Sequence, residues 1–86
     1  MKFQGAVIKE LGVTFAVVVV KKSVIDNRFV ANRAVQSFQP LFPSIPVVLM
    51  AQDFRSRPKY YSRRDIVRFL ARVPIHAIPW KEYTVN

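Results

Sequence analysis

The side chains in this sequence that could do chemistry are mostly cations, and half of them lie between Arg55 and Arg72. The basic residues of this segment are Arg55, Arg57, Lys59, Arg63, Arg64, Arg68 and Arg72. Asp65 is the only acid there, so the segment carries a net charge of +6, compared with +9 for the whole chain of 86 residues. Because like charges held this close repel one another, their concentration predicts a surface that binds an anion.

Aromatic side chains alternate with these cations at Phe54, Tyr60 and Tyr61. Arginine neutralises phosphates and aromatic rings stack on unpaired bases, although an acidic protein surface would also satisfy the charge. The sequence therefore predicts a non-enzymatic module that binds an anionic partner, an acidic protein or nucleic acid. The predicted binding residues are Arg55, Arg57, Lys59, Tyr60, Arg63, Arg64, Arg68 and Arg72. The alternative is that the arginines form only a solvated helix face.

Side chains suited to catalysis or metal binding are sparse. The chain has no cysteine, which excludes disulfides and thiolate ligands. The single histidine, His76, has no acid near it in sequence and cannot hold a metal ion alone. Two glycines cannot make a glycine-rich phosphate loop, and no serine lies in a G-x-S-x-G turn. We therefore expect no metal site, no cofactor and no enzymatic activity.

Asp53 and Ser62 define the one candidate pocket. Asp53 follows a buried apolar segment, at the strand end where parallel sheets bind ligands. Ser62 precedes Arg63 and Arg64 at a predicted helix start, where backbone N–H groups can hold an anion. The alternative for Asp53 is that it starts a turn.

Two helices and four strands are expected to position these residues. Residues 3–10 and 13–20 are predicted strands of a hairpin that turns at residues 10–12, and the second is apolar on both faces, which indicates a central strand. A helix over residues 24–39 follows, capped by Ser23 with Asp26 or by Asp26 itself, and residues 45–51 are the third strand. Residues 52–61 are predicted to be a loop.

The second helix has the clearest signals in the chain. Ser62 is its predicted N-cap, with Asp65 three residues later, and Pro74 ends it. Its apolar residues share one face, and Arg64, Arg68 and Arg72 form a row on nearly the opposite face. Residues 76–85 are the last predicted strand, and Pro79 places that strand at an edge of the sheet.

The element order ββαβαβ predicts one α+β domain over residues 1–86, a two-layer fold with a four-stranded mixed sheet, an antiparallel first strand and two packed helices. If both helices cover one face, the valines of the other face need a partner, most simply in a homodimer. Trp80 and Tyr83 lie on opposite faces of the last strand, so one is expected to anchor an interface. The alternative function is thus a structural or regulatory protein that acts through dimerisation or a partner at the sheet face and Trp80 edge.

The sequence also predicts a cytoplasmic protein that does not enter a membrane. Its longest apolar run, residues 13–20, is far shorter than the roughly 20 residues that a membrane-spanning helix needs. Lys9 and Glu10 interrupt the N-terminal apolar segment before it could serve as an export signal.

Residues 42–51, Phe-Pro-Ser-Ile-Pro-Val-Val-Leu-Met-Ala, resemble the fourth-strand region of response-regulator receiver domains. The order of strands and helices from Val13 to Val85 is similar to the second half of that fold. Receivers place a phospho-accepting aspartate at the end of the strand before the first of these helices, where this chain has Lys21 and Lys22. The resemblance therefore implies no phosphorylation site and no activity.

Overall fold

A hairpin of two long strands forms the centre of the sheet. β1 (Lys2–Glu10) and β2 (Val13–Val19) pair antiparallel from Gly5 with Val18 to Glu10 with Val13, which confirms the predicted hairpin. Gly12 has a φ of 76°, in the left-handed region that glycine adopts without strain. The computed structural model describes residues 1–10 and 12–85, so Leu11, within the predicted turn, lies outside the described residues.

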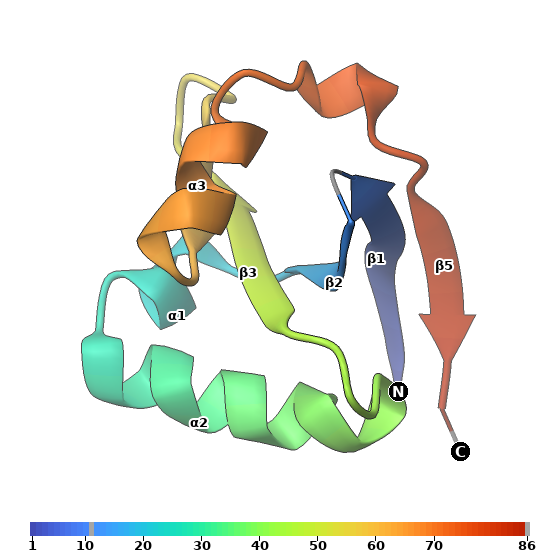
Figure 1. Ribbon diagram of the computed structural model, residues 1–86. Coiled ribbons are helices and arrows are strands. Elements are labelled where there is room, and N and C mark those ends of the chain that lie inside the picture. The colour runs from blue at the N-terminus through green and yellow to red at the C-terminus, as the bar shows by residue number, and fades with distance from the viewer. Residues whose placement is uncertain (11, 86) are drawn as a thin grey trace.

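Three further strands extend this hairpin into a mixed sheet with the order β4-β3-β2-β1-β5 (Figure 1). β3 (Val47–Gln52) runs parallel to β2, β4 (Pro58–Tyr61) antiparallel to β3, and β5 (Lys81–Thr84) antiparallel to β1. The predicted α+β class and the central position of β2 are confirmed. The sheet has five strands rather than four, because residues 58–61 of the predicted loop pair with β3.

The first predicted helix is divided in two, α1 (Lys22–Ile25) and α2 (Arg28–Phe38). Asn27 is extended, and its Oδ1 accepts a hydrogen bond from the backbone N–H of Val30 at 3.2 Å, so α2 begins there. Asp26 instead pairs with Lys22 of α1, with Nζ and Oδ2 2.6 Å apart. The predicted caps at Ser23 and Asp26 were therefore wrong. The chain leaves α2 through a short 3-10 turn, η1 (Gln39–Leu41), before β3.

The second predicted helix is α3 (Arg64–Leu70), which is shorter than expected because it ends well before Pro74. Arg72, predicted to continue the row of Arg64 and Arg68, lies in the turn after the helix. Its N-cap residue is Arg63 and makes no side-chain capping bond, so the predicted cap at Ser62 was wrong. A 3-10 turn, η2 (Ile75–Ala77), replaces the start of the predicted last strand, and β5 is an edge strand as expected. Among the described residues, no helix is both long and apolar enough to cross a membrane.

Helices cover both faces of the sheet. On one face, Ala16, Val18 and Leu49 pack with Ala31 of α2. The other face carries a second cluster, in which buried sheet residues pack with buried residues of α3 and of the segment after η2: Ala6, Phe15, Val17, Val48, Met50, Ile66, Leu70 and Ile78. Figure 1 shows α2 and α3 on opposite sides of the strands. The argument for a homodimer assumed that both helices cover one face, so it does not apply to this arrangement.

The aromatic side chains of the C-terminal segment are also packed. Trp80 Nε1 donates to the carbonyl oxygen of Ile75 at 2.9 Å, and its ring packs against the cluster beneath α3. Tyr83 stacks on Phe3 at the opposite face, with ring centroids 5.1 Å apart. The opposite-face expectation is confirmed, and both half-buried rings take part in packing within the chain. The interface role expected of one of them stays a prediction.

Candidate anion-binding site

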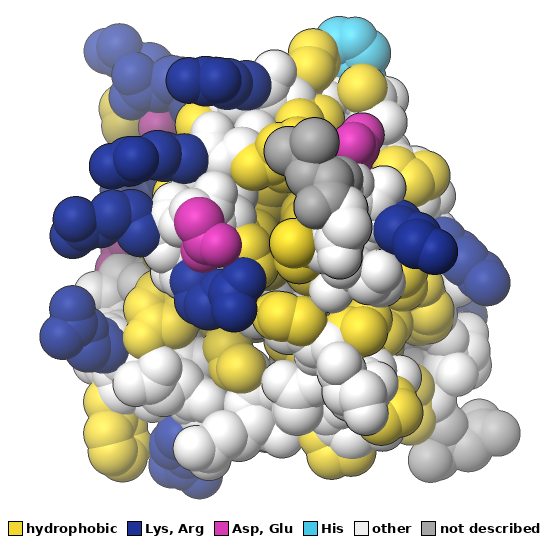
Figure 2. Space-filling view, viewed as in Figure 1, with side chains coloured by type: hydrophobic (Ala, Val, Ile, Leu, Met, Phe, Trp, Pro, Cys, Tyr) yellow, Lys and Arg dark blue, Asp and Glu magenta, His cyan; other side chains and the backbone are white. Residues whose placement is uncertain are grey.

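The predicted cations lie outside the core. Ile66 and Leu70 of α3 are 4% and 0% exposed, which seals the inner side of the helix against the sheet. The side chains of the predicted site that reach solvent are called the basic face here: Arg55, Arg57, Lys59, Arg63, Arg64, Arg68 and Arg72. Figure 2 shows Lys and Arg side chains gathered along the left side of the view, the side on which Figure 1 places α3.

Few carboxylates neutralise this face. Arg57 pairs with Asp53 at 3.0 Å, and Arg63 pairs with Asp65 at 3.3 Å between two largely exposed side chains. Exposed pairs of this kind contribute little to stability. Within residues 1–10 and 12–85, no ion pair joins Arg64, Arg68 or Arg72 to a carboxylate. These three guanidinium groups are therefore free to bind an external anion.

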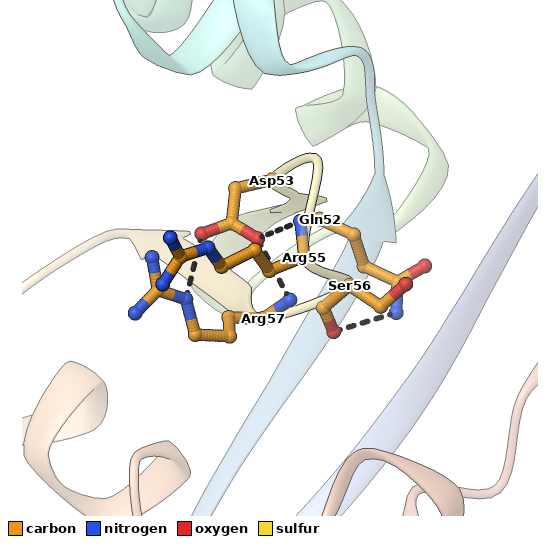
Figure 3. A network of polar contacts seen from close by, with 5 residues as sticks. All are labelled: Gln52, Asp53, Arg55, Ser56 and Arg57. Atoms are coloured by element: carbon orange, nitrogen blue, oxygen red, sulfur yellow. Dashed lines mark hydrogen bonds and ion pairs between the residues drawn. The ribbon is translucent and has the colours of Figure 1, made fainter.

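Asp53 organises the loop that precedes β4 (Figure 3). Its Oδ1 accepts hydrogen bonds from the backbone N–H groups of Arg55 at 2.8 Å and Arg57 at 2.9 Å, and its Oδ2 accepts from Arg57 Nε at 3.0 Å. The side chain of Asp53 is only 7% exposed. Hydrogen bonds to the carboxylate lower the pKa of Asp53, and the largest contribution comes from the backbone N–H of Arg57. Burial acts in the opposite direction but is outweighed. The Asp53 carboxylate therefore holds the loop in its conformation through hydrogen bonds within the loop.

The same loop holds two further features. Ser56 has a φ of 62°, and its carbonyl oxygen accepts a hydrogen bond from Gln52 Nε2 at 3.2 Å. Phe54 is 87% exposed, and the guanidinium carbon of Arg55 lies 5.5 Å from its ring centroid. Sequence reasoning noted Phe54 among the aromatics but did not place it in the site. The sequence signal for its exposure was its position directly after Asp53, a residue type that often starts a turn.

Tyr60 is half-buried, in contrast to the exposed cations of the basic face. Its ring packs against the core beneath α3, and its hydroxyl is buried without a hydrogen-bond partner among the described residues. Burial raises the pKa of Tyr60, which keeps the phenol neutral. The structure thus gives Tyr60 a packing role, and its predicted role in binding stays a prediction. Tyr61, on the other face of β4, donates its hydroxyl to Asn32 Oδ1 of α2.

The structure places Asp53 and Ser62, the residues of the predicted pocket, apart from each other. The two residues lie beyond opposite ends of β4, and neither lines the clefts found between α3 and the β1–β2 hairpin. α3 has seven residues and begins after Arg63, which leaves Ser62 outside it. His76 is exposed on η2, and the described residues contain no group of three potential metal ligands.

Neutralising Asp53 should loosen its loop. In Asp53→Asn the side chain can no longer accept all three hydrogen bonds, so we expect several-fold faster exchange of the Arg55 and Arg57 amide protons. Because the folded state lowers the pKa of Asp53 below 3.8, the carboxylate stabilises the wild type fully above that value, and this contribution is lost as the pH falls through the lowered pKa. When the exchange of the Arg55 and Arg57 amide protons is followed by NMR as the pH is lowered through this pKa, their protection should fall in the wild type. It should not change with pH in this way in Asp53→Asn. Equal protection in both proteins at pH 7 would contradict the role of Asp53.

Comparisons of the chain with known protein families, with curated proteins and with solved structures found no match. The receiver-like segment of residues 42–51 follows η1 and contains the connection to β3 and most of β3, and the end of β2 is followed by Val20 and Lys21, not an acid. Function is therefore inferred from the side chains and their geometry.

Proposed function

We propose that this protein is a non-enzymatic module that holds an anionic partner through the basic face. The observation that carries the proposal is the row of Arg64, Arg68 and Arg72, three exposed guanidinium groups without an ion-pair partner in the described chain. Arg64 and Arg68 lie on α3, which Ile66 and Leu70 fix to the sheet, and Arg72 lies in the turn that directly follows the helix. A polyanion could contact several of these groups at once.

The charge of the whole molecule supports the same proposal. A net charge of +9 on 86 residues attracts anions over a distance and speeds their association. Arginine also suits phosphates and carboxylates better than lysine, because its planar group can donate two parallel hydrogen bonds. The absence of cysteine fits a reducing compartment, and we propose a cytoplasmic location in which such partners occur.

Salt dependence tests the proposal directly. We expect the affinity of the protein for heparin or an oligonucleotide to fall roughly 100-fold between 50 and 200 mM salt if about four anionic groups are contacted. Isothermal titration calorimetry or fluorescence anisotropy would give the slope, and polyglutamate would serve as a carboxylate polyanion. Failure to bind any of these polyanions at 50 mM salt, or an affinity that does not change with salt, would refute the proposal.

A further inference from the structure

Phe54 is exposed in a way that folding alone does not explain. A phenylalanine that is 87% exposed contributes almost nothing to the core, and it stands on a loop that Asp53 fixes through three hydrogen bonds. The ring is therefore held outward by a rigid support (Figure 3 shows the polar network). One side of it lies near the Arg55 guanidinium, and its high exposure leaves surface for another flat group.

A second exposed phenylalanine lies towards the other end of β4. Phe29 of α2 is 70% exposed, and the guanidinium carbon of Arg33 lies 6.0 Å from its ring centroid. The contact between Tyr61 and Asn32 joins the end of β4 to α2, and Asn32 is three residues after Phe29. Residues at this spacing share one side of a helix. Two exposed rings, each beside an arginine, therefore flank the edge strand that carries Lys59.

We infer that the anionic partner is single-stranded nucleic acid, whose unpaired bases stack on Phe54 and Phe29 while its phosphates bind the basic face. The inference rests on the proposed function and adds the class of partner. An acidic protein supplies negative charge but few flat rings, and a duplex supplies phosphates but hides its base faces. A single strand offers a phosphate and a stacking surface at every nucleotide, and proteins bind it with the combination of aromatic and basic side chains found here.

Three polyanions distinguish these partners. The full chain is titrated at 100 mM salt with a 12-nucleotide single strand of mixed sequence, with the same sequence as a duplex, and with a heparin fragment of similar charge. We expect the single strand to bind at least tenfold more tightly than the other two. Phe54→Leu should weaken binding of the single strand about tenfold, the lower part of the range for one stacked base, and leave heparin binding unchanged. Phe29→Leu should act in the same direction.

Matched variants isolate the ring. Phe54→Tyr keeps an aromatic face and should keep the affinity, whereas Leu41→Ala removes an exposed apolar side chain of η1 and should have no effect. Phe54→Trp should show quenched emission with the single strand but not with heparin, measured against the signal of Trp80 in the wild type. Circular dichroism confirms that each variant is folded, and because Phe54 is exposed, its replacement should leave the core intact.

The outcomes separate the inference from the proposed function. If Phe54→Leu keeps the single-strand affinity, or if heparin or the duplex binds as tightly as the single strand, the inference is overturned while salt-dependent polyanion binding still stands. Binding to phosphatidylserine vesicles that depends on Phe54, without preference for the single strand, would overturn it in favour of a membrane surface. If none of the probes binds, both the inference and the proposed function fail.

Discussion

Replacing Arg64, Arg68 and Arg72 together by glutamine is expected to lower the affinity for a single-stranded oligonucleotide about 100-fold at 0.1 M salt. Each lost phosphate contact removes about 0.7 from the slope of log affinity against log salt, so the slope should fall by about 2. Glutamine is nearly as good a helix former as arginine, and the three side chains are exposed, so α3 should stay folded. Fluorescence anisotropy at several salt concentrations measures both effects.

A control with the same change in net charge tests whether position matters. Lys2, Lys9 and Lys81 are exposed on β1 and β5, at the side of the sheet away from β4. Their replacement by glutamine removes three charges but none from the basic face, so we expect a much smaller loss of affinity. Equal losses in the two triple variants would show that only net charge counts, and would contradict a localised site.

Leu70→Ala should have the largest effect on stability. Leu70 is 0% exposed and joins α3 to the sheet residues beneath it, so truncation leaves a cavity as well as removing apolar contact. We expect a loss of about 3 kcal/mol in the free energy of unfolding. Small domains have about 5–15 kcal/mol in total, so this variant should unfold at a clearly lower urea concentration.

Arg68→Ala provides the matched control on the same helix. Its side chain is exposed and has no ion-pair partner among the described residues, so the free energy of unfolding should change by less than about 0.5 kcal/mol. Urea denaturation followed by circular dichroism compares the two. A loss below about 1 kcal/mol for Leu70→Ala would show that α3 is not packed on the sheet as described.

Much of the fold followed from local patterns. The apolar run of β2 indicated a central strand, and Pro79 indicated an edge, because these features depend on burial and hydrogen bonding of a few neighbouring residues. β4 was missed because Pro58 and Lys59 look like loop residues, although Tyr60 and Tyr61 favour a strand. Short edge strands depend on a partner strand for their hydrogen bonds, and the sequence alone does not identify that partner.

The placement of the two helices required information that local patterns do not contain. The chain after β4 must cross from one edge of the sheet to β5 at the other edge, and it can pass over either face. The structure takes it over the face opposite α2, where Ile66, Leu70 and Ile78 cover Val17 and Val48. The apolar character of β2 on both sides was consistent with this result, but it did not specify what covers each side.

In the candidate site, too, some positions could be predicted from nearby residues, whereas others depend on contacts between distant parts of the chain. The outward positions of Arg64 and Arg68 could be predicted, because helical spacing separates them from Ile66 and Leu70. Arg72 is also exposed, but it lies in the turn after α3 and not on the helix. The packing of Tyr60 could not be predicted, because it depends on β4 and on the core beneath α3. The placement of α2, with Phe29, beside the end of β4 depends on the contact between Tyr61 and Asn32, which are 29 residues apart in sequence.

The two outer strands have a consequence for self-assembly. β4 and β5 have only four residues each, β4 begins with Pro58 and continues with Lys59, and β5 begins with Lys81. Short outer strands that carry proline or lysine resist hydrogen bonding to a neighbouring molecule. The valine-rich segments that would favour fibril growth are enclosed between them, so the folded protein should withstand crowding without polymerising.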